Sequence, residues 1–507
     1  MIELRADRRR LAALTVIAVL GAVLRFFRLG QQSFWIDEIL TIGSYSSPDG
    51  GISYGVKLMW DVHGPLYSLV MHFWSAVSSS EAWLRAPGAA AGVVTVLLMY
   101  FWLRRESSEG TALTGALLMA LNPFNIYYSQ ELRFYSFLTM FVVLSLLAFS
   151  RFDEKPDWRN GLLLGLSLGL ACLSHFMAIF LCAGLALYMS VRGKLRGNHL
   201  RYGALAAVVA LVIVSPWIYR ELYFIKRIRA VDAAMRPVEY RMKDLGPSTL
   251  MAYPYGLFAF AMGFSYGPDL RELHEASSVA SLLGRYGAHI AIAALLFGSA
   301  ALAGMSRLFR EKRAALYICV LAATIGLVTV AAVLKIKVLN ARYLMCAFPA
   351  FIAVIAHGIP RARLAGMAAV SALCLLMLVS VWNYHFTPRY ARDDIRGAIS
   401  IISDAEMPGD LILAPGMEPV VRHYYGGCRP VESVYAAHLD RARISEKLDR
   451  MTEGRRRVWL LECRAWDTDA EGHIASYFEA GMKRSAGYEL PGVSLILYEP
   501  ASSPLSR

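Results

Sequence analysis

The sequence predicts a polytopic α-helical membrane protein of about eleven transmembrane helices, followed by a small C-terminal α/β domain. Of its 507 residues, 56% are hydrophobic and 18% are charged, which is more apolar than a single soluble core of this length can bury. Long apolar runs alternate with short basic clusters, and acidic residues, Gly and Pro return after about residue 384. These observations favour lipid as the solvent for most of the chain.

Eleven runs approach the roughly 20 apolar residues that a membrane span needs. The first run follows a basic N-terminus but has no small-residue cleavage pattern, so we interpret it as an uncleaved span. The predicted spans are 11–29, 86–103, 111–128, 134–150, 161–175, 177–191, 202–218, 286–306, 314–334, 343–359 and 364–383.

The net charge of +13 falls in basic clusters between these runs, which is typical of topology determinants rather than of nucleic-acid binding. Placing every cluster in the cytoplasm requires an even number of spans between neighbouring clusters, so 161–191 is predicted to be a hairpin with His175 at its outer tip. The N-terminus is then cytoplasmic. The clusters begin at Arg8, Arg104, Arg151, Arg192, Arg307 and Arg361.

Three long segments then lie outside the cytoplasm. Segment 31–85 holds two amphipathic stretches with several Trp residues, as expected of helices at the membrane interface. Segment 219–285 is a long external loop that is basic, against the positive-inside rule. Either the rule tolerates long loops, or this loop handles phosphates. The apolar run 249–266 within it is predicted to be a re-entrant or interfacial helix.

The third external segment, 386–507, is predicted to be a small periplasmic α/β domain. Strand-like pieces at 410–414 and 457–461 alternate with helical pieces near 393–404 and 441–452. Five of the seven cysteines lie in apolar runs, where packing is their expected role. Cys428 and Cys463 lie in this domain, and an oxidising compartment would allow them to form one disulfide.

An acid pair, Asp37-Glu38, follows the first span directly. Loop carboxylates often serve solubility alone, but this pair abuts Phe34 and Trp35 rather than a polar run. Acids at membrane depth are expensive and usually functional. The pair is therefore the first candidate for catalysis.

A second polar cluster, Gln130, Glu131, Arg133 and Tyr135, joins the third and fourth spans. The acid and the arginine form either a capping salt bridge or a functional pair. Arginine is suited to bidentate phosphate binding, and glutamate to a metal ion or a sugar hydroxyl.

Two further stretches contain candidate substrate-binding residues. The first runs from His63 through Gly64-Pro65 to Tyr67, although a lone His is more often structural. The second contains Lys337, Arg342 and Tyr343 at the outer entrance to the tenth span. Basic residues on the external side disfavour a purely topological role, so phosphate binding is predicted there.

In their order and placement, these four motifs resemble the C-type glycosyltransferases over residues 11–385. The similar branches are the bacterial relatives of protein O-mannosyltransferases and of the lipid A aminoarabinose transferase, and the tail resembles their variable periplasmic domain. The resemblance implies a bacterial inner-membrane enzyme. It would move a sugar from a polyprenyl-phosphate donor to a hydroxyl of a lipid, glycan or protein on the extracytoplasmic face.

The resemblance also implies roles for individual residues. Asp37 matches the first-loop acid of the family, which is either the catalytic base or an essential acid, with Glu38 as its neighbour, and Arg133 matches an arginine after the third span. Gly64 stands where the family often has a second Pro and the aminoarabinose branch has a phosphate-binding Lys, which argues against that branch.

The mechanism predicted from these residues is direct displacement with inversion. Asp37 accepts the proton of the acceptor hydroxyl, and a divalent metal ion at Glu131 is a candidate cofactor. The residues predicted to bind donor phosphate are Arg133, Arg342, Tyr343, Lys337 and His63. Those predicted to bind the rest of the substrates are Gln130, Tyr135 and Tyr67.

Three other functions compete with this one. A lipid-linked glycan flippase or transporter would place ionisable residues in mid-span. A polysaccharide polymerase or ligase would use external arginines without an acid pair after the first span. A non-catalytic subunit of a glycan assembly complex would not need the acid pair.

Overall fold

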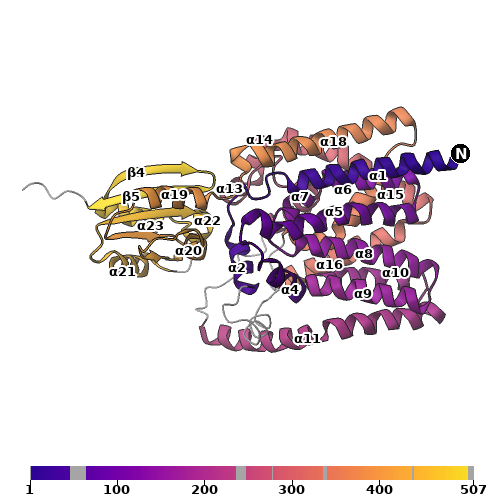
Figure 1. Ribbon diagram of the computed structural model, residues 1–507, viewed down its shortest axis with the longest axis horizontal. Coiled ribbons are helices and arrows are strands. Elements are labelled where there is room, and N and C mark those ends of the chain that lie inside the picture. Colours follow the sequence, from indigo (N-terminus) through magenta and orange to yellow (C-terminus); the bar gives the residue numbers. More distant parts are fainter. Residues whose placement is uncertain are drawn as a thin grey trace, which may run out of the picture.

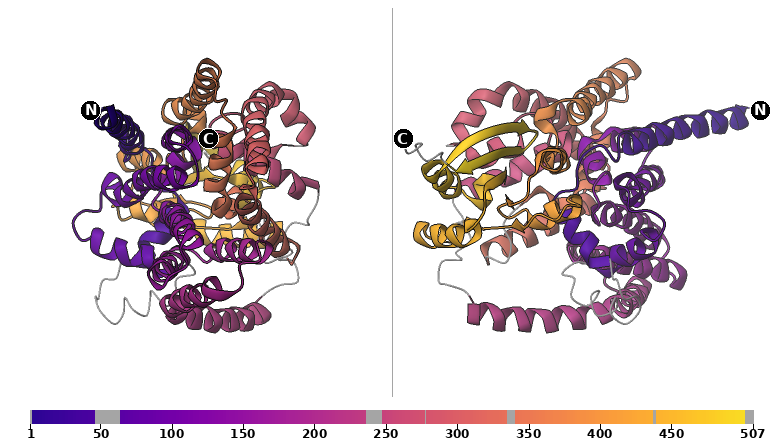
Figure 2. Two further views of the ribbon diagram at one scale, coloured as in Figure 1. Left: turned by 90° about the vertical axis from the view of Figure 1, so that its right-hand side faces the viewer. Right: turned by 60° about the vertical axis from the view of Figure 1, so that its left-hand side comes forward.

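The chain folds into a helical module with a sheet domain attached at one end. The computed structural model describes residues 2–45, 64–235, 247–276, 278–334, 340–436 and 439–500. The long helices lie side by side, and the sheet domain lies at the end of the module away from the N-terminus (Figures 1 and 2).

Seven helical segments in the described part of the chain are long and apolar enough to cross a membrane. Each of them contains or closely overlaps one predicted span, which confirms the polytopic helical class. They are α5 (Glu81–Glu106), α8 (Tyr135–Glu154), the first 23 residues of α11 (Gly197–Met235), α14 to α15 (Val279–Arg310), α16 (Ala314–Val333), η2 (Ala341–Ala347) with α17 (Phe348–Gly358), and α18 (Arg363–Phe386).

The other four predicted spans are also helical, but as shorter or more charged elements. Run 111–128 is corrected from one helix to two, because Pro123 has no N–H to continue the ladder. Asn122 caps the second helix by accepting from the Asn125 N–H at 2.9 Å. The elements are α1 (Ile2–Phe26), α6 (Glu109–Leu121) with α7 (Pro123–Ser129), α9 (Trp158–Ser174) and α10 (Ala178–Val191).

The segments between the spans contain the helices predicted at 31–85 and 249–266, and further helices that were not predicted. The two amphipathic stretches are the short helices α2 (Ile36–Tyr45) and α4 (Pro65–Trp74). The expected loop 219–285 begins as a continuation of α11 and then forms α12 (Pro247–Met262), α13 (Leu270–Glu275) and the start of α14. Helix α12 contacts α7, η2 and α18, so it belongs to the helical module.

Several basic clusters lie together at the end of the module that holds the N-terminus (Figure 1). Ion pairs join them there, one across the connection between α5 and α6 and three between ends of helices that are not consecutive. These pairs are Arg104–Glu109 at 2.5 Å, Arg105–Glu154, Lys194–Asp153 at 2.5 Å and Arg361–Glu311 at 2.8 Å. This grouping agrees with the placement of these clusters on one side of the membrane.

The C-terminal domain is a five-stranded mixed sheet with helices on both faces, as predicted. The strand order is β2-β1-β3-β5-β4, in which β1 pairs parallel with β2 and β3, and β5 pairs antiparallel with β3 and β4. The strands are β1 (Asp410–Leu413), β2 (Val431–Glu432), β3 (Arg457–Cys463), β4 (Met482–Leu490) and β5 (Val493–Pro500).

Each face of the sheet has its own apolar core. One core packs under α19 (Ile395–Ala405) and α20 (Glu418–Tyr424), and the other under α21 (Arg441–Thr452) and α23 (His473–Gly481). A short helix, α22 (Ala465–Thr468), follows β3. The thiols of Cys428 and Cys463 are both free, the first exposed and the second buried, so they do not form the disulfide considered above.

Candidate active site

The acid pair lies in the first turn of α2. This helix follows the loop that leaves the end of α1. Trp35 caps this helix: its carbonyl accepts from the Glu38 N–H at 3.0 Å, and its own N–H donates to Glu38 Oε2 at 3.3 Å. Carboxylates are favourable at a helix N-terminus because the exposed N–H groups carry partial positive charge. The local sequence therefore fixes both acids at one corner of the module.

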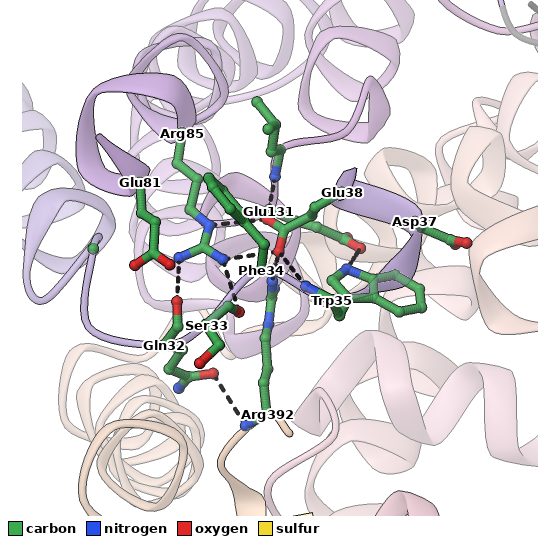
Figure 3. A network of polar contacts seen from close by, with 12 residues as sticks. Gln32, Ser33, Phe34, Trp35, Asp37, Glu38, Glu81, Arg85, Glu131 and Arg392 are labelled. Carbon is green, nitrogen blue, oxygen red and sulfur yellow. Dashed lines mark hydrogen bonds and ion pairs between the residues drawn. The ribbon is translucent and has the colours of Figure 1, made fainter. Parts of the chain in front are cut away.

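Glu38 is fully buried at the centre of a polar network, the Glu38 hub, and is not an accessible acid (Figure 3). Its oxygens accept from Arg85 Nε at 2.9 Å and Nη2 at 2.8 Å, from the Leu132 N–H at 2.7 Å and from Arg392 Nη1 at 3.1 Å. Burial alone would raise the pKa of Glu38, but the charges of Arg85 and Arg392 bring this pKa below its ordinary value. Glu38 is thus ionised and has no acceptor site left for a substrate.

Asp37 points away from this hub (Figure 3). Its side chain is 26% exposed, and Oδ2 lies 3.4 Å from Nη1 of Arg342, which is 28% exposed. Its backbone carbonyl accepts from Arg133 Nη1 at 3.0 Å, and the same nitrogen donates to Thr41 Oγ1 at 2.8 Å. The structure therefore brings three predicted residues together, with an accessible carboxylate beside an accessible guanidinium.

Glu131 is buried behind Trp35. Its Oε1 accepts from Trp35 Nε1 at 3.0 Å, whereas its Oε2 is buried without a hydrogen-bond partner in the described part of the chain. Burial raises the pKa of Glu131 to about 7, against the opposing charge of Arg392. This carboxyl group therefore titrates near neutral pH.

Several other predicted residues take different positions. Gln130 donates its amide to carbonyls at and just beyond the end of α1, at 3.0 Å from Arg25 O and 2.9 Å from Phe27 O. Tyr135 and Tyr67 are buried near the hub, and the Tyr67 hydroxyl has no hydrogen-bond partner among the described residues.

The remaining predicted phosphate-binding residues divide into one that the structure places and two that it does not describe. Tyr343 lies beside Arg342, with its ring centre 5.5 Å from the guanidinium carbon. His63 and Lys337 lie outside the described residues.

Sequence reasoning missed the two arginines that hold Glu38. Arg85 begins an apolar run as an isolated buried charge, and such a charge at a span is itself a functional signal. Arg392 lies in the linker, residues 387–394 between α18 and α19, and no spacing in the sequence links it to a partner 354 positions earlier.

Glu38 and Glu131 do not by themselves form a site for a divalent metal ion. Hard cations take several oxygen ligands, but both Glu38 oxygens are already occupied by N–H donors and Glu131 offers only Oε2. No group of three His, Cys, Asp or Glu side chains in the described ranges is arranged to hold a metal. We therefore derive no step through a metal ion.

Comparison with known proteins gives one family match and several matches to solved structures. Residues 62–219 match the family model described as dolichyl-phosphate-mannose-protein mannosyltransferase. No curated protein matches the chain.

The fold is similar to that of ArnT from Cupriavidus metallidurans in the apo state, with a TM-score of 0.60, 13% identity and coverage of 97% of this chain and 98% of that one. It is also similar to the oligosaccharyltransferase AglB from Archaeoglobus fulgidus in complex with an inhibitory peptide and a dolichol-phosphate, with a TM-score of 0.53, 13% identity and coverage of 99% and 75%.

A structure of the Archaeoglobus fulgidus oligosaccharyltransferase with Zn and sulfate matches at a TM-score of 0.50 and 14% identity, covering 97% of this chain and 74% of that one. At these identities the structural matches show a shared fold. The family match is limited to residues 62–219, so the comparisons show the fold of the whole chain and a likeness to the mannosyltransferase family over that segment.

Proposed function

We propose that this enzyme transfers a hexose- or pentose-type sugar from a polyprenyl-phosphate donor to a hydroxyl of a lipid, glycan or protein, with inversion at the anomeric carbon. The observation that carries this proposal is the contact between Asp37 and Arg342, 3.4 Å apart and both partly exposed. A base for an acceptor hydroxyl and a cation for a departing phosphate are what this reaction requires.

In the proposed step, the oxygen of the acceptor hydroxyl attacks the anomeric carbon while its proton passes to a carboxylate oxygen of Asp37. The bond between the anomeric carbon and the phosphate oxygen breaks, and its electron pair leaves with the polyprenyl phosphate. Arg342 stabilises the charge that develops on this phosphate. Attack from the face opposite the phosphate inverts the configuration.

The other residues divide into positioning and binding roles. Glu38 holds the first turn of α2, since its oxygens are fully engaged. Arg133 holds Asp37 and Thr41 through Nη1, and is retained as the second cation for the phosphate. The other residues proposed to bind the donor phosphate are Tyr343, Lys337 and His63.

Tyr67 and Tyr135 are proposed to contact the sugar or the acceptor. Gln130 is proposed to act indirectly, because its amide already donates to the carbonyls at the end of α1.

The proposed setting is the bacterial inner membrane, with a catalytic module of residues 1–385 and a periplasmic domain of residues 386–507. The grouping of basic clusters at the end that holds the N-terminus supports a cytoplasmic position for that end. Helix α2, which carries Asp37, and the sheet domain lie at the other end (Figure 1). The acceptor would therefore be met on the periplasmic side.

Transfer of radiolabelled sugar from a panel of synthetic polyprenyl-phosphate monosaccharides tests this function. Purified protein in detergent and in sealed vesicles should transfer label from one donor to an acceptor in a membrane extract. Movement of the labelled donor across the vesicle membrane without transfer would instead favour a flippase. A protein that neither binds polyprenyl phosphate nor transfers sugar from any donor would contradict the proposed donor class.

A further inference from the structure

Four consecutive residues of the loop before Asp37 each contact the linker or the C-terminal domain. The contacts are Arg392 N–H to Gln32 Oε1 at 3.2 Å, Ser33 Oγ to Asp394 Oδ1 at 3.1 Å, Phe34 N–H to Tyr424 Oη at 2.6 Å, and the Arg464 guanidinium carbon 4.9 Å from the centre of a Trp35 ring. In addition, Ile36 and Ile39 of α2 pack against the core under α19 and α20. The sheet domain is thus docked directly on the loop that carries the proposed base.

Arg392 reaches deepest into the helical module. Its side chain is 6% exposed, and its Nη1 pairs with Glu38 Oε2 at 3.1 Å. Its guanidinium carbon lies 4.8 Å from the centre of the Tyr127 ring on α7. Figure 3 shows it approaching Glu38 from the linker, on a different side from Arg85.

Stability alone does not explain the position of this arginine. Its Nε and Nη2 are buried without a hydrogen-bond partner in the described part of the chain, and buried donors without partners are costly. Glu38 already has a complete ion pair with Arg85, with nitrogen–oxygen distances of 2.9 and 2.8 Å. The second guanidinium therefore points to a functional requirement.

We propose that Arg392 is a positioning residue for sugar transfer, which fixes the first turn of α2 through Glu38 and so holds Asp37 in place. The C-terminal part of the chain then supports the proposed catalytic site through this one side chain. This inference rests on the proposed function, because Asp37 is the group that is positioned.

The connection from Arg392 to Asp37 is short. Glu38 follows Asp37 directly in α2, and its donors come from α5, from the loop before α8 and from the linker. Removing the donor on the linker leaves the Glu38 carboxylate held only by donors of the helical module. A small displacement of a catalytic group is enough to slow a reaction by about 100-fold.

The test compares Arg392→Gln and Arg392→Lys with Arg389→Gln. Arg389 is a matched control because it also ties the linker to the module, through Asp269 at 2.9 Å and through Glu272, and it makes no contact with Glu38. The enzyme's kcat and its Kd for undecaprenyl phosphate are measured for each full-length variant.

Arg392→Gln should lower kcat about 10- to 100-fold and leave the Kd for undecaprenyl phosphate within about threefold. Arg392→Lys retains a cation for Glu38 and should recover most of kcat. Arg389→Gln should keep kcat within about threefold of wild type. Equal losses of kcat in Arg392→Gln and Arg389→Gln would overturn the proposal, since they would show a general effect of domain attachment.

Hydrogen exchange of the α2 amides provides a second readout that does not depend on activity. These amides should exchange faster in Arg392→Gln than in wild type or in Arg389→Gln. Unchanged exchange in α2 would overturn the positioning role of Arg392. This result does not require that a transferred sugar be found. The absence of transfer by wild type, with faster exchange in Arg392→Gln, would contradict the proposed function alone.

Discussion

Asp37 and Arg342 are 305 positions apart in the chain, yet their side chains meet at 3.4 Å where α2 and η2 begin. Both are partly exposed, in contrast to the buried pair formed by Arg85 and Glu38. The first pair is open to a substrate, whereas the second is sealed into the fold. This difference separates the residues proposed for chemistry from those that hold them.

Replacing Arg342 should weaken donor handling. Arg342→Gln removes a charge-assisted donor to the phosphate, and the loss of such a hydrogen bond costs roughly 1.5–3 kcal/mol, or about 10- to 150-fold in affinity. Arg342→Lys should lose less, because it keeps the charge but not the planar fork. The Kd for undecaprenyl phosphate is the measurement, and equal values for wild type and both variants would place the phosphate site elsewhere.

Replacing Glu38 should destabilise the fold. Glu38→Gln leaves Arg85 and Arg392 buried beside a neutral group, and breaking a buried ion pair in this way costs about 3–5 kcal/mol. As a control, Glu154→Gln removes an exposed partner of Arg105, which should cost less than about 1 kcal/mol. Thermal unfolding in detergent compares the two, and a similar small shift for both would refute the hub role of Glu38.

The carboxyl group of Glu131 should make stability depend on pH. Its pKa is raised from 4.5 to about 7 in the folded state, so between these pH values the unfolded chain releases a proton that the folded chain keeps. Stability therefore falls as pH rises through this window. Glu131→Gln, which keeps an acceptor for Trp35, should remove a penalty of about 3 kcal/mol at pH 8 and almost none near pH 4.5. The unfolding temperatures of wild type and Glu131→Gln are measured across this pH range. No gain in stability of the variant over wild type at high pH would contradict the account.

Gln130 should prove to be structural. Gln130→Leu removes the amide that donates to three carbonyls at the end of α1, and leaving such groups unpaired costs about 1–3 kcal/mol. We expect a lower unfolding temperature and an unchanged Kd for undecaprenyl phosphate. A weaker Kd with normal stability would restore the predicted role in substrate binding.

The helical architecture follows largely from the apolar runs, because each span must satisfy its backbone internally and expose apolar side chains to lipid. The continuation of α11 to Met235 was not predicted. The segment from residue 219 is not a predicted span and was therefore expected to be a loop, although its Lys and Arg residues are good helix formers.

The position after the first span identified the acid pair in the sequence. The different roles of the two carboxylates could not be predicted from it. Nothing in Asp37-Glu38 shows which carboxylate faces a substrate. That depends on Arg85, 47 positions away, and on Arg392, 354 positions away. Such partners become visible only when helix α5 and the linker are packed against the same turn of α2.

The central claim is that Asp37 is the base, and a comparison of wild type with Asp37→Asn tests it most directly. Asp404→Asn, an exposed change on the C-terminal domain, is the control. Single-turnover sugar transfer and the Kd for undecaprenyl phosphate are measured on the same preparations. We predict that Asp37→Asn lowers the transfer rate by about 100-fold or more, with a Kd within about threefold of wild type. Near-normal transfer by Asp37→Asn would contradict the assignment of the base.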